Sequence, residues 1–143
     1  MQYLPMDELL KTCDMLSLHV PVTEETTGMC DREFFAKCRK GSYFVNTSRG
    51  ELVDDDALRE ALENGTIVMA GLDTLDHEPV QKSHPMLSWP EETKEKILFS
   101  SHIGGITGSS FDRGYAMIWE DIEKISRGEA PGHIVNQKEL NGE

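Results

Sequence analysis

Residues 42–73, SYFVNTSRGELVDDDALREALENGTIVMAGLD, decide the fold because they place one helix between two apolar runs of strand length. The runs are SYFVN and MAGLD at the two ends of this stretch, and such nearly continuous hydrophobic runs are typical of strands buried on both faces. A helix is expected over 54–64, where Asp54 can cap the first turn and Gly65 ends the last. Its apolar stripe consists of Ala57, Leu58, Ala61 and Leu62. Two strands joined in this way are predicted to lie parallel, as a β-α-β unit.

Two more apolar runs extend the pattern on either side, MLSLHV at 15–20 and ILFSS at 97–101. The four runs begin 27, 27 and 28 residues apart, which leaves room for a right-handed crossover between each pair. Further helices are expected over 31–39, in a short segment that ends at 9–11, and in an amphipathic segment at about 110–127. The fold class is therefore α/β, with one parallel sheet of about four strands and flanking helices.

Two other segments have features that need an explanation. Residues 75–96 form a long connection with three prolines, and a connection of this length in a compact domain is a candidate functional loop. The last predicted helix has an apolar stripe that core packing or a subunit contact explains better than a cofactor site does. This stripe consists of Phe111, Tyr115, Ile118, Trp119, Ile122 and Ile125.

The composition is that of a folded, acidic chain. Of its 143 residues 38% are hydrophobic, and 14 Lys and Arg against 26 Asp and Glu give a net charge of −12. This charge repels phosphate backbones and anionic lipids, so neither nucleic acid nor a membrane is an expected partner. The sequence shows no signal peptide and no run of the ~20 apolar residues that cross a bilayer, so we expect a cytoplasmic location. Cys13, Cys30 and Cys38 form no C-x-x-C pair, and neither a metal site nor a disulfide framework is expected.

Polar residues follow all four apolar runs, and the carboxyl ends of parallel strands form the edge of a sheet where ligands bind. They are His19 with Val20 and Pro21, then Thr47 and Arg49, then Asp73 and Glu78, and finally His102 and Gly104. A histidine beside a carboxylate can act as a general acid or base, and an arginine can hold a carboxylate with two hydrogen bonds. The set suits chemistry on a small 2-oxo or 2-hydroxy acid.

Taken alone, each of these residues also has a simpler interpretation. Arg49 would serve in a surface ion pair, Asp73 as a cap of a helix or turn, Glu78 as a solvated loop charge and His19 as a core histidine. Their placement on one sheet edge favours the functional interpretation. The strongest case is His102, because the glycines that follow it permit close approach of the backbone to a ligand.

Four segments together carry a resemblance to a known family. They are LLKTCDMLSLHVPVTEETTGM at 9–29, GSYFVNTSRGELVDDDAL at 41–58, AGLDTLDHEP at 70–79 and SSHIGG at 100–105. In this order and spacing, N-T-S-R-G, D-x-x-x-x-E-P and H-I-G-G closely resemble the D-isomer-specific 2-hydroxyacid dehydrogenases. The chain departs from the family pattern at Lys40, which replaces a proline, and at Met15, which replaces a β-branched residue.

The resemblance implies an oxidoreductase with a Rossmann-like domain that binds NAD, or NADP in its place, and acts on a small 2-oxo or 2-hydroxy acid. Arg49 would bind the substrate carboxylate and carbonyl, His102 would donate and accept the proton, and Glu78 would pair with His102. The residues along the cofactor would be His19, Val20, Pro21, Thr47, Asp73 and Gly104, with Asp73 at the nicotinamide end.

One part of the family pattern is missing. The sequence has no G-x-G-x-x-G turn and no acidic residue about 20 positions further on, the features that hold the pyrophosphate and the ribose. The resemblance therefore implies that residues 1–143 are a partial NAD-binding domain that is inactive alone. The alternative is a non-catalytic oligomerising fragment or interaction module that keeps the fold. In both cases an unpaired sheet edge predicts self-association or association with a missing N-terminal half.

Overall fold

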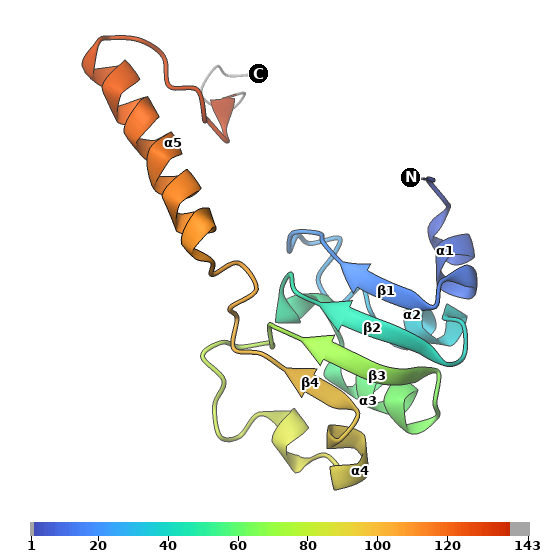
Figure 1. Cartoon of the computed structure of the whole chain (residues 1–143). Helices are drawn as coiled ribbons and strands as arrows, with labels where there is room; N and C mark the ends of the chain where they lie inside the picture. Colours follow the sequence, from blue (N-terminus) through green and yellow to red (C-terminus); the bar gives the residue numbers. More distant parts are fainter. Residues whose placement is uncertain (1, 138–143) are drawn as a thin grey trace. The chain divides into compact units, whose positions relative to one another are not determined.

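The computed structural model describes residues 2–137, and a parallel sheet of four strands is its central feature. The strands β1 (Met15–Leu18), β2 (Ser42–Asn46), β3 (Ile67–Leu72) and β4 (Ile97–Phe99) lie side by side in sequence order (Figure 1). Each neighbouring pair is parallel, so all four carboxyl ends reach the same edge. The predicted α/β fold class is confirmed, and the strands lie at the four predicted apolar runs.

Helices precede the first three strands, as the sequence predicts. They are α1 (Met6–Thr12), α2 (Arg32–Lys37) and α3 (Asp55–Glu63). The Asp54 side chain caps α3 by accepting a hydrogen bond from the Ala57 N–H at 3.0 Å, and Asp31 caps α2 in the same way through Phe34 at 2.8 Å. Because short polar caps fix where these helices begin, their starts were predictable to within one residue.

The prediction that the strands are buried on both faces is wrong for the described residues. In β1 and β2 buried and exposed residues alternate, with Leu16 and Phe44 pointing into the core. The opposite face carries Met15, Tyr43, Met69 and Leu98, which are 44 to 71% exposed. The helices of residues 2–104 cover only one face of the sheet (Figure 1). Because the exposed face also carries apolar side chains, the hydrophobic pattern of the sequence does not alternate and does not show which face is exposed.

The long connection between β3 and β4 is structured. It contains the short 3₁₀ helix η2 (Pro85–Ser88) and the helix α4 (Glu91–Lys94), neither of which was predicted. Met86 and Trp89 are buried and anchor this segment to the core. The connection is therefore attached to the core at these two residues.

The chain divides into two compact units, and the second unit begins at Gly105. Its main element is α5 (Gly108–Ser126), which confirms the predicted amphipathic helix at about 110–127 with a start two residues earlier. Thr107 and Ser110 form a capping box at its start. No described residue of α5 is buried, so the contact expected for its apolar stripe stays a prediction. No helix among residues 2–137 is both long enough and apolar enough to cross a membrane.

Candidate active site

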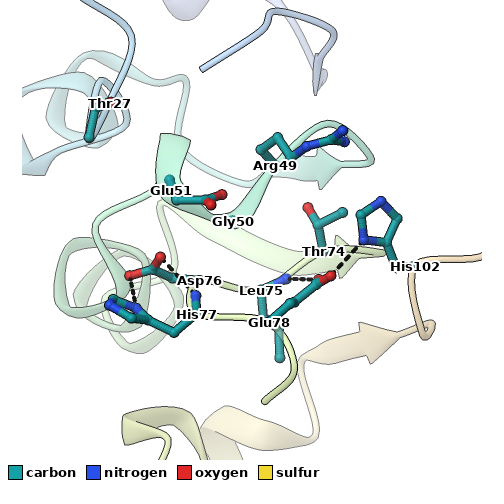
Figure 2. Close-up of a pocket in the computed structure, with 10 residues that line it drawn as sticks. All are labelled: Thr27, Arg49, Gly50, Glu51, Thr74, Leu75, Asp76, His77, Glu78 and His102. Atoms are coloured by element: carbon teal, nitrogen blue, oxygen red, sulfur yellow. Dashed lines mark hydrogen bonds and ion pairs between the residues drawn. The ribbon is translucent and has the colours of Figure 1, made fainter. Parts of the chain in front are cut away.

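The carboxyl ends of β2, β3 and β4 border a cleft of about 540 Å³ (Figure 2). Its lining brings together the three predicted catalytic residues, Arg49, Glu78 and His102, which are far apart in the sequence. Glu51, Asp76 and His77 line the same cleft. The parallel topology explains this meeting, because each of these residues follows the end of a strand at the same sheet edge.

His102 and Glu78 form a direct pair. The Nδ1 atom of His102 lies 2.6 Å from the Oε2 atom of Glu78, and the other carboxylate oxygen accepts a hydrogen bond from the Leu75 N–H at 2.9 Å. The hydrogen bond from His102 is the main cause that lowers the pKa of Glu78 below its ordinary value, and the nearby charge of Arg49 acts in the same direction. With Nδ1 engaged, Nε2 is the ring nitrogen of His102 that can exchange a proton with a ligand.

Asp73 holds the turn that carries His102. Its carboxylate accepts hydrogen bonds from the Ser100 hydroxyl, from the Ile103 N–H at 3.0 Å and from the Gly104 N–H at 2.8 Å. The bond from Ser100 is the largest cause that lowers the pKa of Asp73, with the two backbone bonds adding to it. A Cβ atom at Gly104 would lie 2.8 Å from this carboxylate, so a side chain there would crowd the turn. His102 itself has a φ of 56°, which this clamp helps to maintain.

Arg49 is positioned by a second buried polar residue, Asn46. The Asn46 amide donates to the carbonyl oxygen of Arg49 at 2.7 Å and accepts from the Ser48 N–H at 3.0 Å. The Ser48 hydroxyl in turn donates to the Leu18 carbonyl at the end of β1, at 2.8 Å. The Arg49 side chain stays exposed, and one guanidinium nitrogen donates to the Ser48 carbonyl at 2.7 Å. The loop is therefore fixed while the guanidinium remains available to a ligand.

Gly50 allows two loops of the cleft to meet. It is buried at the start of the 3₁₀ helix η1 (Gly50–Leu52), and a Cβ atom there would overlap the backbone of Leu75 and Asp76. This close approach places the loop with Arg49 against the loop with Glu78. The glycine belongs to the N-T-S-R-G motif, but its steric role could not be inferred from that motif alone.

The predicted cofactor residues lie at the same edge with different degrees of contact. His19, Val20 and Pro21 line a second cleft of about 460 Å³ at the end of β1, which Arg49 also lines. Thr47 is exposed next to this cleft in sequence but does not line it. Asp73 and Gly104 are engaged with each other in the turn described above. The two clefts thus share Arg49, an arrangement that fits a cofactor on one side and a substrate on the other.

Sequence reasoning missed two positioning residues and one buried polar residue of the cleft. Asn46 and Ser100 support the loops of Arg49 and His102, and the available signal was a polar residue at the end of an apolar run. Thr74 is 2% exposed, and its hydroxyl has no hydrogen-bond partner among residues 2–137. Across these residues there is also no group of three His, Cys, Asp or Glu side chains arranged to hold a metal ion.

Comparison with known proteins identifies the same family throughout. Residues 1–104 match the NAD-binding domain of the D-isomer specific 2-hydroxyacid dehydrogenases. A glyoxylate reductase of Korarchaeum cryptofilum is 36% identical over 137 residues, which are 96% of this chain and 40% of that protein. A D-3-phosphoglycerate dehydrogenase of Methanocaldococcus jannaschii is 35% identical over 135 residues, 94% of this chain and 25% of the relative. The solved D-lactate dehydrogenase of Lactobacillus jensenii with NAD⁺ matches with a TM-score of 0.79 and 32% identity, over 94% of this chain and 43% of that one. The chain therefore spans about two fifths or less of the length of these relatives.

Proposed function

The chain belongs to the D-isomer-specific 2-hydroxyacid dehydrogenases, and from this premise we propose that its strand-end cleft serves hydride transfer between a nicotinamide cofactor and a small 2-oxo or 2-hydroxy acid. The observation that carries the proposal is the His102–Glu78 pair at 2.6 Å, which lines one cleft with Arg49. A positioned imidazole and a guanidinium in one cleft are what the reduction of a 2-oxo acid needs from its protein.

The three side chains have separate roles in this proposal. Arg49 holds the substrate carboxylate with two parallel N–H donors and thereby orients the carbonyl group. His102 gives a proton from Nε2 to the C2 oxygen during reduction and takes it back during oxidation. Glu78 accepts the hydrogen bond from Nδ1, which fixes the tautomer and orientation of the ring and stabilises its protonated form.

The cofactor belongs in the second cleft. NAD, or NADP in its place, supplies or accepts the hydride when it is bound. The residues that we propose to lie along it are His19, Val20, Pro21, Thr47, Asp73 and Gly104. The fit is supported by the open cleft beside β1 and by its common wall with the substrate cleft at Arg49. Since the sequence has no G-x-G-x-x-G turn, we expect the chain by itself to bind NADH weakly or not at all and to be inactive.

A second candidate function is a non-catalytic module that associates with another chain. It is favoured by the exposed apolar face of the sheet and by β1, which is unpaired along one edge in the described sheet. The partner would be a second copy or the half of a dehydrogenase that carries the G-x-G-x-x-G turn. Light scattering distinguishes this: a mass of one 16.1 kDa chain at all concentrations contradicts self-association.

The proposed function can be tested on the chain itself by nuclear magnetic resonance. Titration with glyoxylate should shift the ring resonances of His102 and the guanidinium resonance of Arg49 by more than the resonances of residues outside the cleft. His102→Gln should abolish the ring signal while leaving the Arg49 shift, and Arg49→Lys should weaken the binding because the two-pronged contact is lost. Shifts confined to residues outside the cleft would refute the assignment. In parallel, NADH and NADPH should bind only weakly in calorimetry, and a low-micromolar dissociation constant would contradict the expected loss of the pyrophosphate cradle.

A further inference from the structure

The cleft has an unbalanced set of charges. Among the described residues that line it, one guanidinium, that of Arg49, stands against the carboxylates of Glu51, Asp76 and Glu78, and there is no lysine. Figure 2 shows Arg49 and His102 on one side of the cleft and Glu51 and Asp76 on the other. A bound acid that places its carboxylate at Arg49 therefore lies in a cleft where negative charge prevails.

The three carboxylates are not equally compensated. Glu78 is paired with His102 and also accepts the Leu75 N–H. Asp76 contacts its own neighbour, with Oδ2 2.7 Å from Nδ1 of His77 and Oδ1 accepting the His77 N–H at 2.9 Å. The exposed side chain of Glu51 makes no hydrogen bond or ion pair within residues 2–137. One carboxylate on the substrate is thus balanced by Arg49, while a second anionic group has no arginine or lysine in the cleft to receive it.

We propose, on the basis of the function proposed above, that Glu51 and Asp76 make this cleft selective for 2-oxo and 2-hydroxy monocarboxylic acids with an uncharged third substituent. Hydrogen, methyl and hydroxymethyl substituents add no charge and are accepted. A phosphate monoester, which is close to a dianion above its second pKa of about 6, or a second carboxylate is repelled. The selection arises from the field of the cleft, so it does not require the substituent to touch either carboxylate.

The size of the effect follows from partly screened charges. Like charges at the protein surface interact through an effective dielectric between that of water and that of the interior, so we expect a phosphorylated acid to bind about tenfold more weakly than its unphosphorylated parent. Removal of one carboxylate should recover about three- to fivefold of this difference. The preference should also shrink at high salt, because exposed charges are screened there.

The test compares hydroxypyruvate with its 3-phosphate ester, both titrated into the chain at pH 8 and followed by the resonances of His102 and Arg49. The variants are Glu51→Gln and the double variant Glu51→Gln with Asp76→Asn. Glu92→Gln is the matched control, since Glu92 is exposed on α4 and does not line the cleft. The same titrations are repeated at 0.05 and 0.5 M sodium chloride.

We expect the parent to bind hydroxypyruvate more tightly than its phosphate ester. Glu51→Gln should raise the affinity for the phosphate ester only, and the double variant should raise it further. Glu92→Gln should change neither affinity. Equal affinities for the two acids in the parent, or an equal gain for both acids in Glu51→Gln, overturn the proposed selectivity and leave the proposed function standing. Absence of any shift at His102 and Arg49 with either acid overturns the proposed function itself, and the selectivity with it.

Discussion

Replacement of Asp73 by asparagine tests whether one buried carboxylate holds the turn of His102. Asp73 is 6% exposed and accepts three hydrogen bonds, from Ser100, Ile103 and Gly104. An asparagine can keep its oxygen at the position that serves Ser100 and Ile103, but its NH₂ group then faces the Gly104 N–H. One charge-assisted bond is lost, and the other two become neutral. Together these changes should lower the free energy of unfolding by about 3 kcal/mol.

The effect should also depend on pH. The hydrogen bonds lower the folded-state pKa of Asp73 below its ordinary value, so the carboxylate stabilises the fold above about pH 4. This contribution is lost as the pH falls through the folded-state pKa. The difference in stability between the parent and Asp73→Asn should therefore be largest at pH 7 and should decrease as the solution is made more acidic.

Urea unfolding followed by circular dichroism at a series of pH values measures both effects. Asp112→Asn is the control, because Asp112 is exposed on α5 and makes no hydrogen bond or ion pair within the described residues. We expect this control to change stability by less than about 0.5 kcal/mol. If Asp73→Asn changes the free energy of unfolding at pH 7 by less than about 0.5 kcal/mol, or by an amount that does not vary with pH, the hydrogen bonds to Asp73 contribute little to stability.

Three more changes test the geometry of the site. Gly50→Ala should lower the free energy of unfolding by more than about 2 kcal/mol, because the new Cβ overlaps backbone. The control Gly114→Ala, in open space on α5, should be neutral or stabilising. Urea midpoints that shift by the same amount in both variants would refute this. Thr74→Val should raise the free energy of unfolding by about 1 kcal/mol, because it removes a buried hydroxyl without a partner; a loss in the same urea assay would mean that the hydroxyl is hydrogen-bonded. His102→Ala should move the pKa of Glu78 up toward its ordinary value in a carbon-detected NMR titration, and an unchanged pKa would contradict the pairing.

The strands and the edge that carries the site were predictable because they depend on local features. Each strand is a short apolar run, and the spacing of the runs implies parallel strands with a common carboxyl edge. The meeting of Arg49, Glu78 and His102 follows from this topology. Which face of the sheet is covered was not predictable, because Met15 and Tyr43 are large side chains of types that also occur in protein cores, yet they lie exposed. A pattern of hydrophobic residues alone does not show how many helices are present to cover them.

The turn of His102 depends on information that the sequence does not display. Ser100 reaches Asp73 only because β3 and β4 are paired with Leu72 beside Phe99, and this register is a property of the assembled sheet. From the sequence, Asp73 had two interpretations, a cap of a helix or turn and a contact of the nicotinamide end. The structure shows hydrogen bonds from a turn 30 residues further along the chain instead of a local cap, and the contact with the cofactor stays a prediction.

A buried polar residue stands at the end of β2 and another directly after β3, and both support the loops that carry the reactive groups. Such supporting residues are harder to predict from the sequence than the reactive groups themselves. Asn46 at the end of β2 and Asp73 directly after β3 are both buried, and each uses its side chain to bind the backbone of the turn that carries Arg49 or His102. The reactive side chains must remain accessible to a ligand, so they stand in polar loops where a sequence reading looks for them. Their supports must be removed from water to hold the loops rigidly, and a buried polar residue looks the same in sequence as an exposed one. Substitution of Asn46 or Asp73 is therefore expected to impair the site through stability and loop geometry, although the side chains of Arg49 and His102 are themselves unchanged.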